Sequence, residues 1–208
     1  MAVFLTACGM TDEEKLVRAE KILQSKYGTE FTGERYIQQK FMRDYYRVTA
    51  FPTENPDLII TAEVDTKSDE ASSDYIARMF TVRISDQILR FAGGNGAYIY
   101  VESGLLSDLH SITDPDITPK ELATLLPEEE LSVNIYGSFE NAEACQRLAE
   151  DILPKIAELV SPMKGLLRVY QVDDSHLEEL VLFFETHDPF YERPETIRLS
   201  EALEYRFA

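Results

Sequence analysis

Residues 45–64 read YYRVTAFPTENPDLIITAEV, and this stretch decides the fold class. Two runs rich in β-branched and aromatic residues, Tyr45–Phe51 and Leu58–Val64, are separated by Pro52–Pro56, whose prolines and asparagine favour a turn. A third run of this kind lies just before them, at Phe31–Ile37. The three runs predict an antiparallel meander.

A helix is expected on each side of the meander. The sequence TDEE at residues 11–14 is a capping box, in which the threonine and the last glutamate satisfy each other's backbone amides. Gly28 supplies the left-handed residue that ends this first helix. After the polar stretch 65–73, apolar residues recur at helical spacing over residues 74–92. The first half is therefore predicted to be an α-βββ-α unit.

The second half alternates strands and helices in small groups. Its expected elements are a strand at 97–102, a helix at 119–126, a strand at 131–136, a helix at 140–160 and a hairpin of strands at 166–172 and 177–185. Pro154 should kink the long helix by removing one backbone donor. The turn-rich connector 103–119 is the expected boundary between two subdomains, at about 10–103 and 120–208 within the folded region 10–208.

These elements predict the α+β class, with antiparallel sheets packed against helices in the order α-βββ-α-β-α-β-α-ββ. They argue against a doubly wound parallel sheet, because repeated βαβ units are missing.

The charge balance limits the partners of this 208-residue chain. Its 38 acidic and 20 basic residues give a formal net charge of -18, which repels a phosphate backbone. Nucleic acid is therefore not expected as a partner. No uninterrupted apolar run approaches the ~20 residues that span a bilayer, so membrane attachment requires a covalent or apolar anchor. With Cys8 and Cys145 as the only cysteines, a disulfide framework is excluded.

The amino terminus is apolar and ends in small residues before a cysteine, in the sequence Leu5-Thr6-Ala7-Cys8. This sequence resembles the lipobox of bacterial lipoproteins, in which the cysteine thiol is joined to diacylglycerol. The resemblance implies that residues 1–9 are a signal remnant and anchor, that Cys8 is lipidated, and that the protein lies on the extracytoplasmic side of the cell membrane. A complete signal also has a basic segment and a longer apolar stretch, so coding sequence upstream of residue 1 is expected.

The remaining chain resembles, in a general way, small uncharacterised lipoproteins of Gram-positive bacteria. The alternative interpretation of the amino terminus is an apolar tail on a cytoplasmic regulatory or structural domain.

Few residues carry a catalytic or metal-binding signature. The acidic loop at 65–74 lacks EF-hand spacing, and the three histidines form no zinc motif, so no metal or cofactor is expected. Cys145 lies in register with the apolar residues of its helix and is expected in the core. There is no Gly-x-Ser-x-Gly elbow. A non-enzymatic role is therefore favoured, and the alternative is a surface-attached hydrolase with dispersed acidic catalytic residues.

Tyrosines are the most suggestive feature for binding. Tyr98 and Tyr100 share one face of their strand by the two-residue period, while Tyr136 and Tyr170 lie on later strands. Tyrosine offers a flat apolar ring with a polar tip, which suits recognition of an envelope protein, a peptide or a glycan. We therefore predict a binding surface at Tyr98 and Tyr100 if their rings face solvent. The leading hypothesis is a lipid-anchored extracytoplasmic binding or assembly protein.

Overall fold

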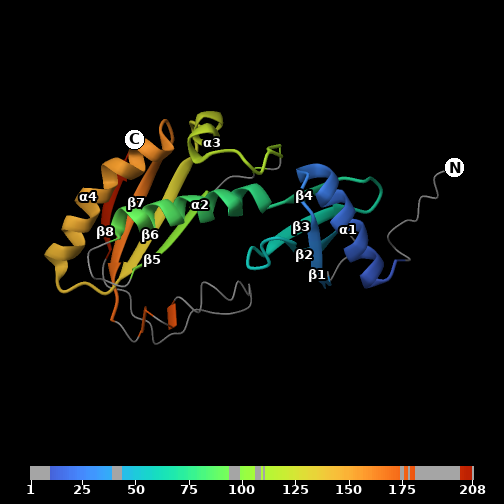
Figure 1. The fold of residues 1–208 in the computed structure, drawn as a ribbon, viewed down its shortest axis with the longest axis horizontal. Coiled ribbons are helices and arrows are strands. Elements are labelled where there is room, and N and C mark those ends of the chain that lie inside the picture. Colours follow the sequence, from blue (N-terminus) through green and yellow to red (C-terminus); the bar gives the residue numbers. More distant parts are fainter. Residues whose placement is uncertain are drawn as a thin grey trace. The chain divides into compact units, whose positions relative to one another are not determined.

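The computed structural model describes residues 10–38, 44–93, 99–105, 109, 111–173, 176–177, 179–180 and 202–207, and of residues 99–105 only the backbone. The chain divides into two compact units, one of Met1–Met79 with Asp108–Asp116 and one of Phe80–Ser107 with Ile117–Ala208. Each unit contains a four-stranded sheet with helices (Figure 1). The predicted α+β class is confirmed.

The first unit packs a helix against one face of an antiparallel sheet. In order, its elements are α1 (Asp12–Tyr27), β1 (Phe31–Ile37), β2 (Tyr45–Pro52), β3 (Ile60–Asp65) and β4 (Ala71–Ser73). The strands pair in sequence order, so the predicted meander is confirmed and gains a fourth strand. The predicted capping box is also present, because the Thr11 amide donates to Glu14 Oε2 at 2.7 Å. Gly28 ends α1 with φ of 70°.

Strand alternation decides which residues of this sheet face α1. Val48, Ala50, Ala62 and Val64 are fully buried on the helix side. A β-bulge between Gly33 and Arg35 shifts the register of β1, and such a bulge places two consecutive residues opposite one on the neighbouring strand. The opposite side of the sheet carries Arg47, Thr49, Thr61 and Glu63 among its residues.

Strand β4 lies in the stretch 65–73 that the sequence predicts to be a polar loop. Its residues pair with β3, and the buried Ser73 side chain lies 2.8 Å from the Tyr27 hydroxyl of α1. A three-residue strand has no periodicity of its own to read. It forms here because β3 offers an open edge and Tyr27 satisfies the serine hydroxyl.

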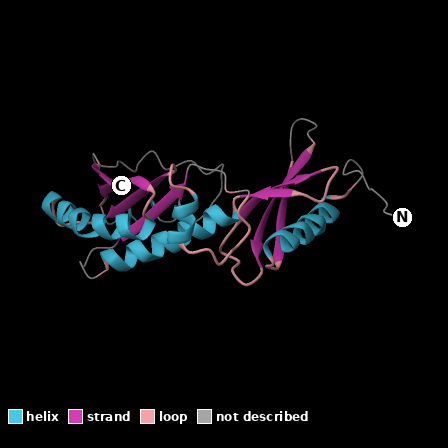
Figure 2. Cartoon of the chain, turned by 90° about the horizontal axis from the view of Figure 1, so that it is seen from above, coloured by secondary structure: helices cyan, strands magenta, loops and turns pink. Residues whose placement is uncertain are grey.

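The second unit has a mixed sheet with helices on one face. From Phe80 onward it contains α2 (Tyr75–Ala92), β5 (Ile99–Leu105), α3 (Pro119–Leu125), β6 (Glu130–Gly137), α4 (Ala142–Val160), β7 (Lys164–Gln171) and β8 (Leu203–Phe207). The strand order is β5-β6-β7-β8, with β6 and β7 parallel and the outer pairs antiparallel. Figure 2 shows the helices of this unit on one side of its sheet.

Helix α4 connects the two parallel strands and supplies much of the core. Cys145 is 3% exposed and lies with Leu148, Ile152 and Ile156 on the buried face, as the sequence predicts. Burial raises the pKa of the Cys145 thiol above its ordinary value. The helix runs on through Pro154.

The hairpin predicted from strands 166–172 and 177–185 is wrong where the structure describes it. The described positions 176, 177, 179 and 180 are helical, and the antiparallel partner of β7 is β8. The helical turn starts at Asp173, whose carbonyl accepts hydrogen bonds from the His176 and Leu177 amides at 2.9 and 3.0 Å. Short apolar runs do not distinguish a buried helix from a strand, which explains the error. The apolar residues 181–184 lie outside the described part of the chain.

The division between the units falls inside α2, after Met79, whereas the sequence places a boundary in the connector 103–119. The reason is the pairing of β5, which matches β6 from Ile99 opposite Gly137 to Leu105 opposite Leu131 and so belongs to the second unit. In the part of the chain that the structure describes, no helix has the length and apolarity needed to cross a membrane.

Candidate binding surface

The two faces of the second sheet differ in chemistry. On β6 and β7 the odd-numbered side chains, Leu131, Val133, Ile135, Leu167 and Val169, are at most 1% exposed on the helix side. The even-numbered residues point the opposite way, because side chains alternate along a strand. We call this opposite side the outer face, formed by Glu130, Ser132, Asn134, Tyr136, Lys164, Leu166, Arg168, Tyr170, Glu204 and Arg206.

Tyrosines on three neighbouring strands fall into one row of this sheet. Tyr100 of β5 is paired with Tyr136 of β6, and Tyr136 is paired with Tyr170 of β7. The rings of Tyr136 and Tyr170 are stacked, with centroids 5.0 Å apart and planes 10° from parallel. The sequence predicts tyrosines at four strand positions. The strand register places the backbones of three of them, Tyr100, Tyr136 and Tyr170, side by side.

One end of the tyrosine row is core. Tyr136 is 5% exposed and forms a cluster with Val172, Leu177 and Leu180, and the partly buried Tyr170 packs against this cluster. The chain after β7 therefore folds over this end of the outer face. Tyr98 lies outside the described residues, and for Tyr100 the structure describes only the backbone pairing.

Arg168 is the central charged group of the outer face. Its Nε donates to Glu204 Oε1 at 2.7 Å, and its Nη1 lies 3.5 Å from Ser132 Oγ. The Glu204 carboxylate raises the pKa of the Arg168 guanidinium further above its ordinary value. Because 31% of the Arg168 side chain is exposed, the group is held in place and still meets solvent.

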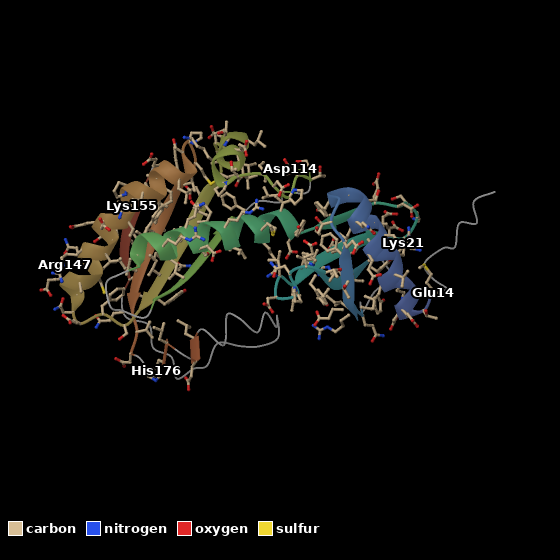
Figure 3. All side chains as sticks on the ribbon, in the orientation of Figure 1. Glu14, Lys21, Asp114, Arg147, Lys155 and His176 are labelled. Carbon is tan, nitrogen blue, oxygen red and sulfur yellow. The ribbon has the colours of Figure 1, made fainter. Side chains whose placement is uncertain are left out.

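The charges of the outer face are balanced. Lys164, Arg168 and Arg206 lie on it with the acidic residues Glu130 and Glu204. The backbone register of β5 also pairs Glu102 with Asn134 of this face. Other cations of this unit lie on the helix side, where Arg147 and Lys155 of α4 point away from the sheet (Figure 3).

The first sheet has a related arrangement on the side away from α1. Arg47 donates from Nε to Glu63 Oε1 at 2.7 Å and also pairs with it through Nη2. Its guanidinium carbon lies 5.9 Å from the centre of the Tyr45 ring. The Thr49 hydroxyl donates to Glu34 at 2.9 Å. An arginine, a glutamate and a tyrosine thus recur here, but acidic residues outnumber basic ones.

The acidic loop at 65–74 is organised by amide and guanidinium donors. The Asp65 carboxylate accepts hydrogen bonds from the Lys67 and Ser68 amides at 2.6 and 2.7 Å, which lowers the pKa of Asp65. The Asp74 carboxylate accepts from the Thr61 amide. Among the described residues, no group of three or more His, Cys, Asp or Glu side chains is placed to hold a metal ion.

Two hollows border α1 in the first unit. One is lined by Glu13, Glu14, Val17, Arg18 and Lys21, and Figure 3 shows Glu14 and Lys21 on this helix. The other lies between α1 and the loop before β4, where the Lys26 ammonium donates to the Ala71 carbonyl at 2.8 Å. Arg18 donates to the Ser68 carbonyl and Lys26 donates to the Ala71 carbonyl. Both cations thus hold α1 against the segment 68–71, and the two hollows are weaker binding candidates than the outer face.

The fold and the polar outer face define a two-unit α+β protein without a recognisable catalytic centre in its described part. The chain is similar in structure to a DUF5037 family protein from Ruminococcus gnavus ATCC 29149, known from a crystal structure at 2.55 Å resolution. The TM-score is 0.59 at 17% sequence identity, over 93% of this chain and 90% of that one, and the likeness concerns the fold alone. No protein-family model and no curated protein matches the sequence.

Proposed function

We propose that this chain is a lipid-anchored extracytoplasmic binding or assembly protein that uses the outer face of its second sheet. The observation that carries the proposal is the arrangement of Arg168, Glu204 and Tyr170 on the side of the sheet opposite the helices. On a sheet face that only supports the fold, the side chains are usually apolar if helices cover the face, and they are unconnected polar groups if the face is open to solvent. Here an oriented guanidinium lies beside a stacked ring, which suits recognition.

The location rests on the sequence Leu5-Thr6-Ala7-Cys8, which lies outside the described residues. Acyl chains on Cys8 would give lasting attachment, since each buried methylene contributes ~0.8 kcal/mol. The formal charge of -18 gives the folded part no attraction to anionic headgroups, so the lipid alone would hold the protein at the membrane.

The alternative function is a surface-attached hydrolase. A general acid at neutral pH needs a raised pKa, which burial or a neighbouring carboxylate provides. The pKa values of Asp65 and Glu121 are lowered instead, that of Asp65 by backbone amides and that of Glu121 by the Thr118 hydroxyl. These two turn and cap residues are therefore not suited to act as the general acid.

The location is tested by expressing the gene with its native upstream region and measuring membrane partition with and without Cys8→Ser. We expect the wild-type chain in the membrane fraction and the variant in the aqueous fraction, because only the thiol accepts the lipid. Equal partition of the two forms would remove the export argument.

The binding role is tested by retention of the purified chain on isolated cell envelope. The variant Arg168→Gln should lose retention while keeping its melting temperature within a few degrees, because its ion pair with Glu204 is partly exposed. The matched control is Arg47→Gln, which removes the related ion pair of the first sheet. Full retention of Arg168→Gln would show that the outer face is not the binding surface.

A further inference from the structure

We propose that β8 is a docking edge for a second copy of this chain, and that two copies join their second sheets into one continuous sheet across a two-fold axis. This inference goes beyond the proposed function, because it concerns the edge of the sheet and not the ligand of the outer face. The sequence of β8 identifies the partner, since this strand is complementary to its own copy.

Among the described strands, β1 and β4 form the edges of the first sheet, and β5 and β8 form the edges of the second. An edge strand presents unpaired backbone N–H and C=O groups, so proteins usually protect it from pairing with another chain. β1 is protected by its bulge and by Glu20, whose carboxylate accepts a hydrogen bond from the Gly33 amide at 2.8 Å. β4 is protected by its length of only three residues. Both edges of the first sheet are therefore unsuited to pairing.

The two edges of the second sheet differ in their charge pattern. In a two-fold pair of antiparallel strands, residues at equal distances before and after the centre lie opposite each other. The centre of β5 is Glu102, which would lie opposite its own copy, and like charges in this position are destabilising. β8 reads LEYRF, has the uncharged Tyr205 at its centre, and pairs with β7 in continuous register. The edge at β8 therefore lacks the repulsion that protects β5.

The sequence of β8 is complementary to itself about Tyr205. With Tyr205 opposite its own copy, Glu204 lies opposite Arg206 of the second copy, and Arg206 lies opposite Glu204. Leu203 and Phe207 lie opposite each other in the same way. The charged pairs fall on the outer face, and the apolar pairs fall on the helix side, because side chains alternate along the strand. A second copy thus matches β8 on both faces of the sheet.

The charges of β8 also select one register. When the helices of both copies stay on the same side of the sheet, the centre of the pair is a single residue. A centre at Glu204 sets two carboxylates opposite each other, and a centre at Arg206 sets two guanidiniums opposite each other, so both registers are destabilised. A centre at Leu203 or Phe207 leaves most of the strand unpaired. Only the register centred on Tyr205 avoids both defects.

The helix side of β8 determines how strong the contact is. Leu203 and Tyr205 are partly exposed there, and their burial against the second copy stabilises the pair. Burial and the nearby Glu150 carboxylate of α4 raise the pKa of Tyr205. Glu150 therefore lies near the axis and is repelled by its own copy. A five-residue edge with this opposing charge gives a weak and reversible dimer.

Dimerisation extends the outer face. Glu204 accepts a hydrogen bond from Arg168 at 2.7 Å on its β7 side, and Arg206 of the second copy lies on its other side. The two outer faces form one surface that carries Arg168 and Tyr170 twice. A ligand with two binding groups gains avidity from such a pair of sites.

The oligomeric state of the purified full chain tests the inference directly. Sedimentation equilibrium at physiological ionic strength, over a hundredfold range of protein concentration, should show a reversible equilibrium between monomer and dimer. A wild-type chain that stays monomeric at every concentration overturns the inference. This result would leave the proposed function standing, because that function is tested by envelope retention of Arg168→Gln.

Charge reversal on β8 tests the pairing of side chains. Arg206→Glu and Glu204→Arg should each weaken association about tenfold, because like charges then lie opposite each other. A mixture of the two variants should restore association, since every reversed charge then meets its opposite in the other copy. A mixture that associates no better than either variant alone contradicts the pairing. The control Arg47→Glu reverses a charge on the first sheet and should leave association unchanged; an equal loss there contradicts the assignment to β8.

A cysteine at the centre of β8 tests the register. In a Cys8→Ser background, Tyr205→Cys should form an intermolecular disulfide under mild oxidation, because opposite Cα atoms in an antiparallel pair lie about 4.5–5.5 Å apart. Arg206→Cys is the control, since its own copy lies diagonally across the pair, more than about 7 Å away. Cys145 is 3% exposed and is protected from oxidation in both variants. Absence of the disulfide in Tyr205→Cys, or equal yields in the two variants on a non-reducing gel, overturns the proposed register. Melting temperatures confirm that each variant is folded, and if Glu204→Arg does not fold, Arg206→Glu and the disulfide decide the question.

Discussion

The two sheets of this protein show how similar side chains acquire different properties from their positions. Each sheet carries a cross-strand Arg–Glu pair with a tyrosine nearby, Arg47 with Glu63 in the first and Arg168 with Glu204 in the second. In the first sheet the guanidinium itself lies near the Tyr45 ring. In the second sheet Tyr170 stacks on Tyr136, and the pKa of the Arg168 guanidinium is raised chiefly by Glu204 and also by these two tyrosines.

An ion pair on a sheet does not by itself indicate a binding surface. Surface pairs of this kind contribute little to stability, so their presence alone is not informative. The stacked rings of Tyr136 and Tyr170 beside Arg168 separate the second sheet from the first.

The largest difference between the sheets is expected at one glycine of each, Gly165 and Gly33. A Cβ at Gly165 would overlap the Leu131 carbonyl oxygen and the Phe207 ring, whereas a Cβ at Gly33 would lie 3.0 Å from Leu16 Cβ. Gly165→Ala should therefore lower the free energy of unfolding by about 3 kcal/mol or more, and Gly33→Ala by about 1 kcal/mol. Urea denaturation followed by circular dichroism measures both.

Removing the Phe207 ring in the double variant Gly165→Ala with Phe207→Ala should not restore stability, because the backbone oxygen of Leu131 remains in the way. A mild effect of Gly165→Ala would mean that β6 and β7 are not as closely paired as described.

The capping boxes give an intermediate effect. Thr11→Ala and Thr118→Ala should each lower the free energy of unfolding by about 1 kcal/mol at pH 7, since each threonine caps a helix start. The Thr118 hydroxyl and amide lower the pKa of Glu121 in the folded state. The stabilisation by Glu121 is therefore complete above its ordinary value of about 4.3 and is lost as the pH falls through the lowered folded-state pKa.

The destabilisation caused by Thr118→Ala should accordingly shrink in acid. Melting temperatures of wild type and variant between pH 3 and pH 7 measure this, with Glu121→Gln as the control that lacks the titrating group. A difference in melting temperature between wild type and Thr118→Ala that stays constant across this pH range would show that the Thr118 cap stabilises the helix independently of the charge on Glu121.

The smallest effect on stability is expected from the two ion pairs. Arg47→Gln and Arg168→Gln should each change the free energy of unfolding by less than about 1 kcal/mol, because the paired side chains are between about a third and three fifths exposed. If both variants change stability little and equally, and only Arg168→Gln loses envelope retention, the binding role belongs to the second sheet and not to the first. A large destabilisation by Arg168→Gln would instead assign the pair a structural role.

Local signals in the sequence predicted several elements well. The capping box at Thr11, the glycine at 28 and the turn at Pro52–Pro56 each act within a few residues, so α1 and the first meander could be read directly. The register of Cys145 with its apolar neighbours likewise placed it in the core. The two-residue period put the candidate tyrosines on strands, which the structure confirms for Tyr136 and Tyr170 and, at the backbone, for Tyr100.

Other features depended on partners far away in the sequence. β4 forms only because β3 lies beside it, and the described positions 176, 177, 179 and 180 are helical although the sequence there resembles a strand. The outer face combines residues of β6, β7 and β8, and the ion pair of Arg168 spans 36 positions in sequence. No pattern within either segment indicates this pairing.

The class of fold, the main helices and the meander of the first sheet could therefore be predicted from local sequence, because caps, turns and hydrophobic periodicity act over short distances. The lipobox resemblance, on which the proposed location depends, also comes from the sequence. The burial of Tyr136 and the pairing of Arg168 with Glu204 depend on tertiary contacts. Strand order and register are chosen by burial of one whole sheet face against helices, and that choice involves residues from the entire unit at once.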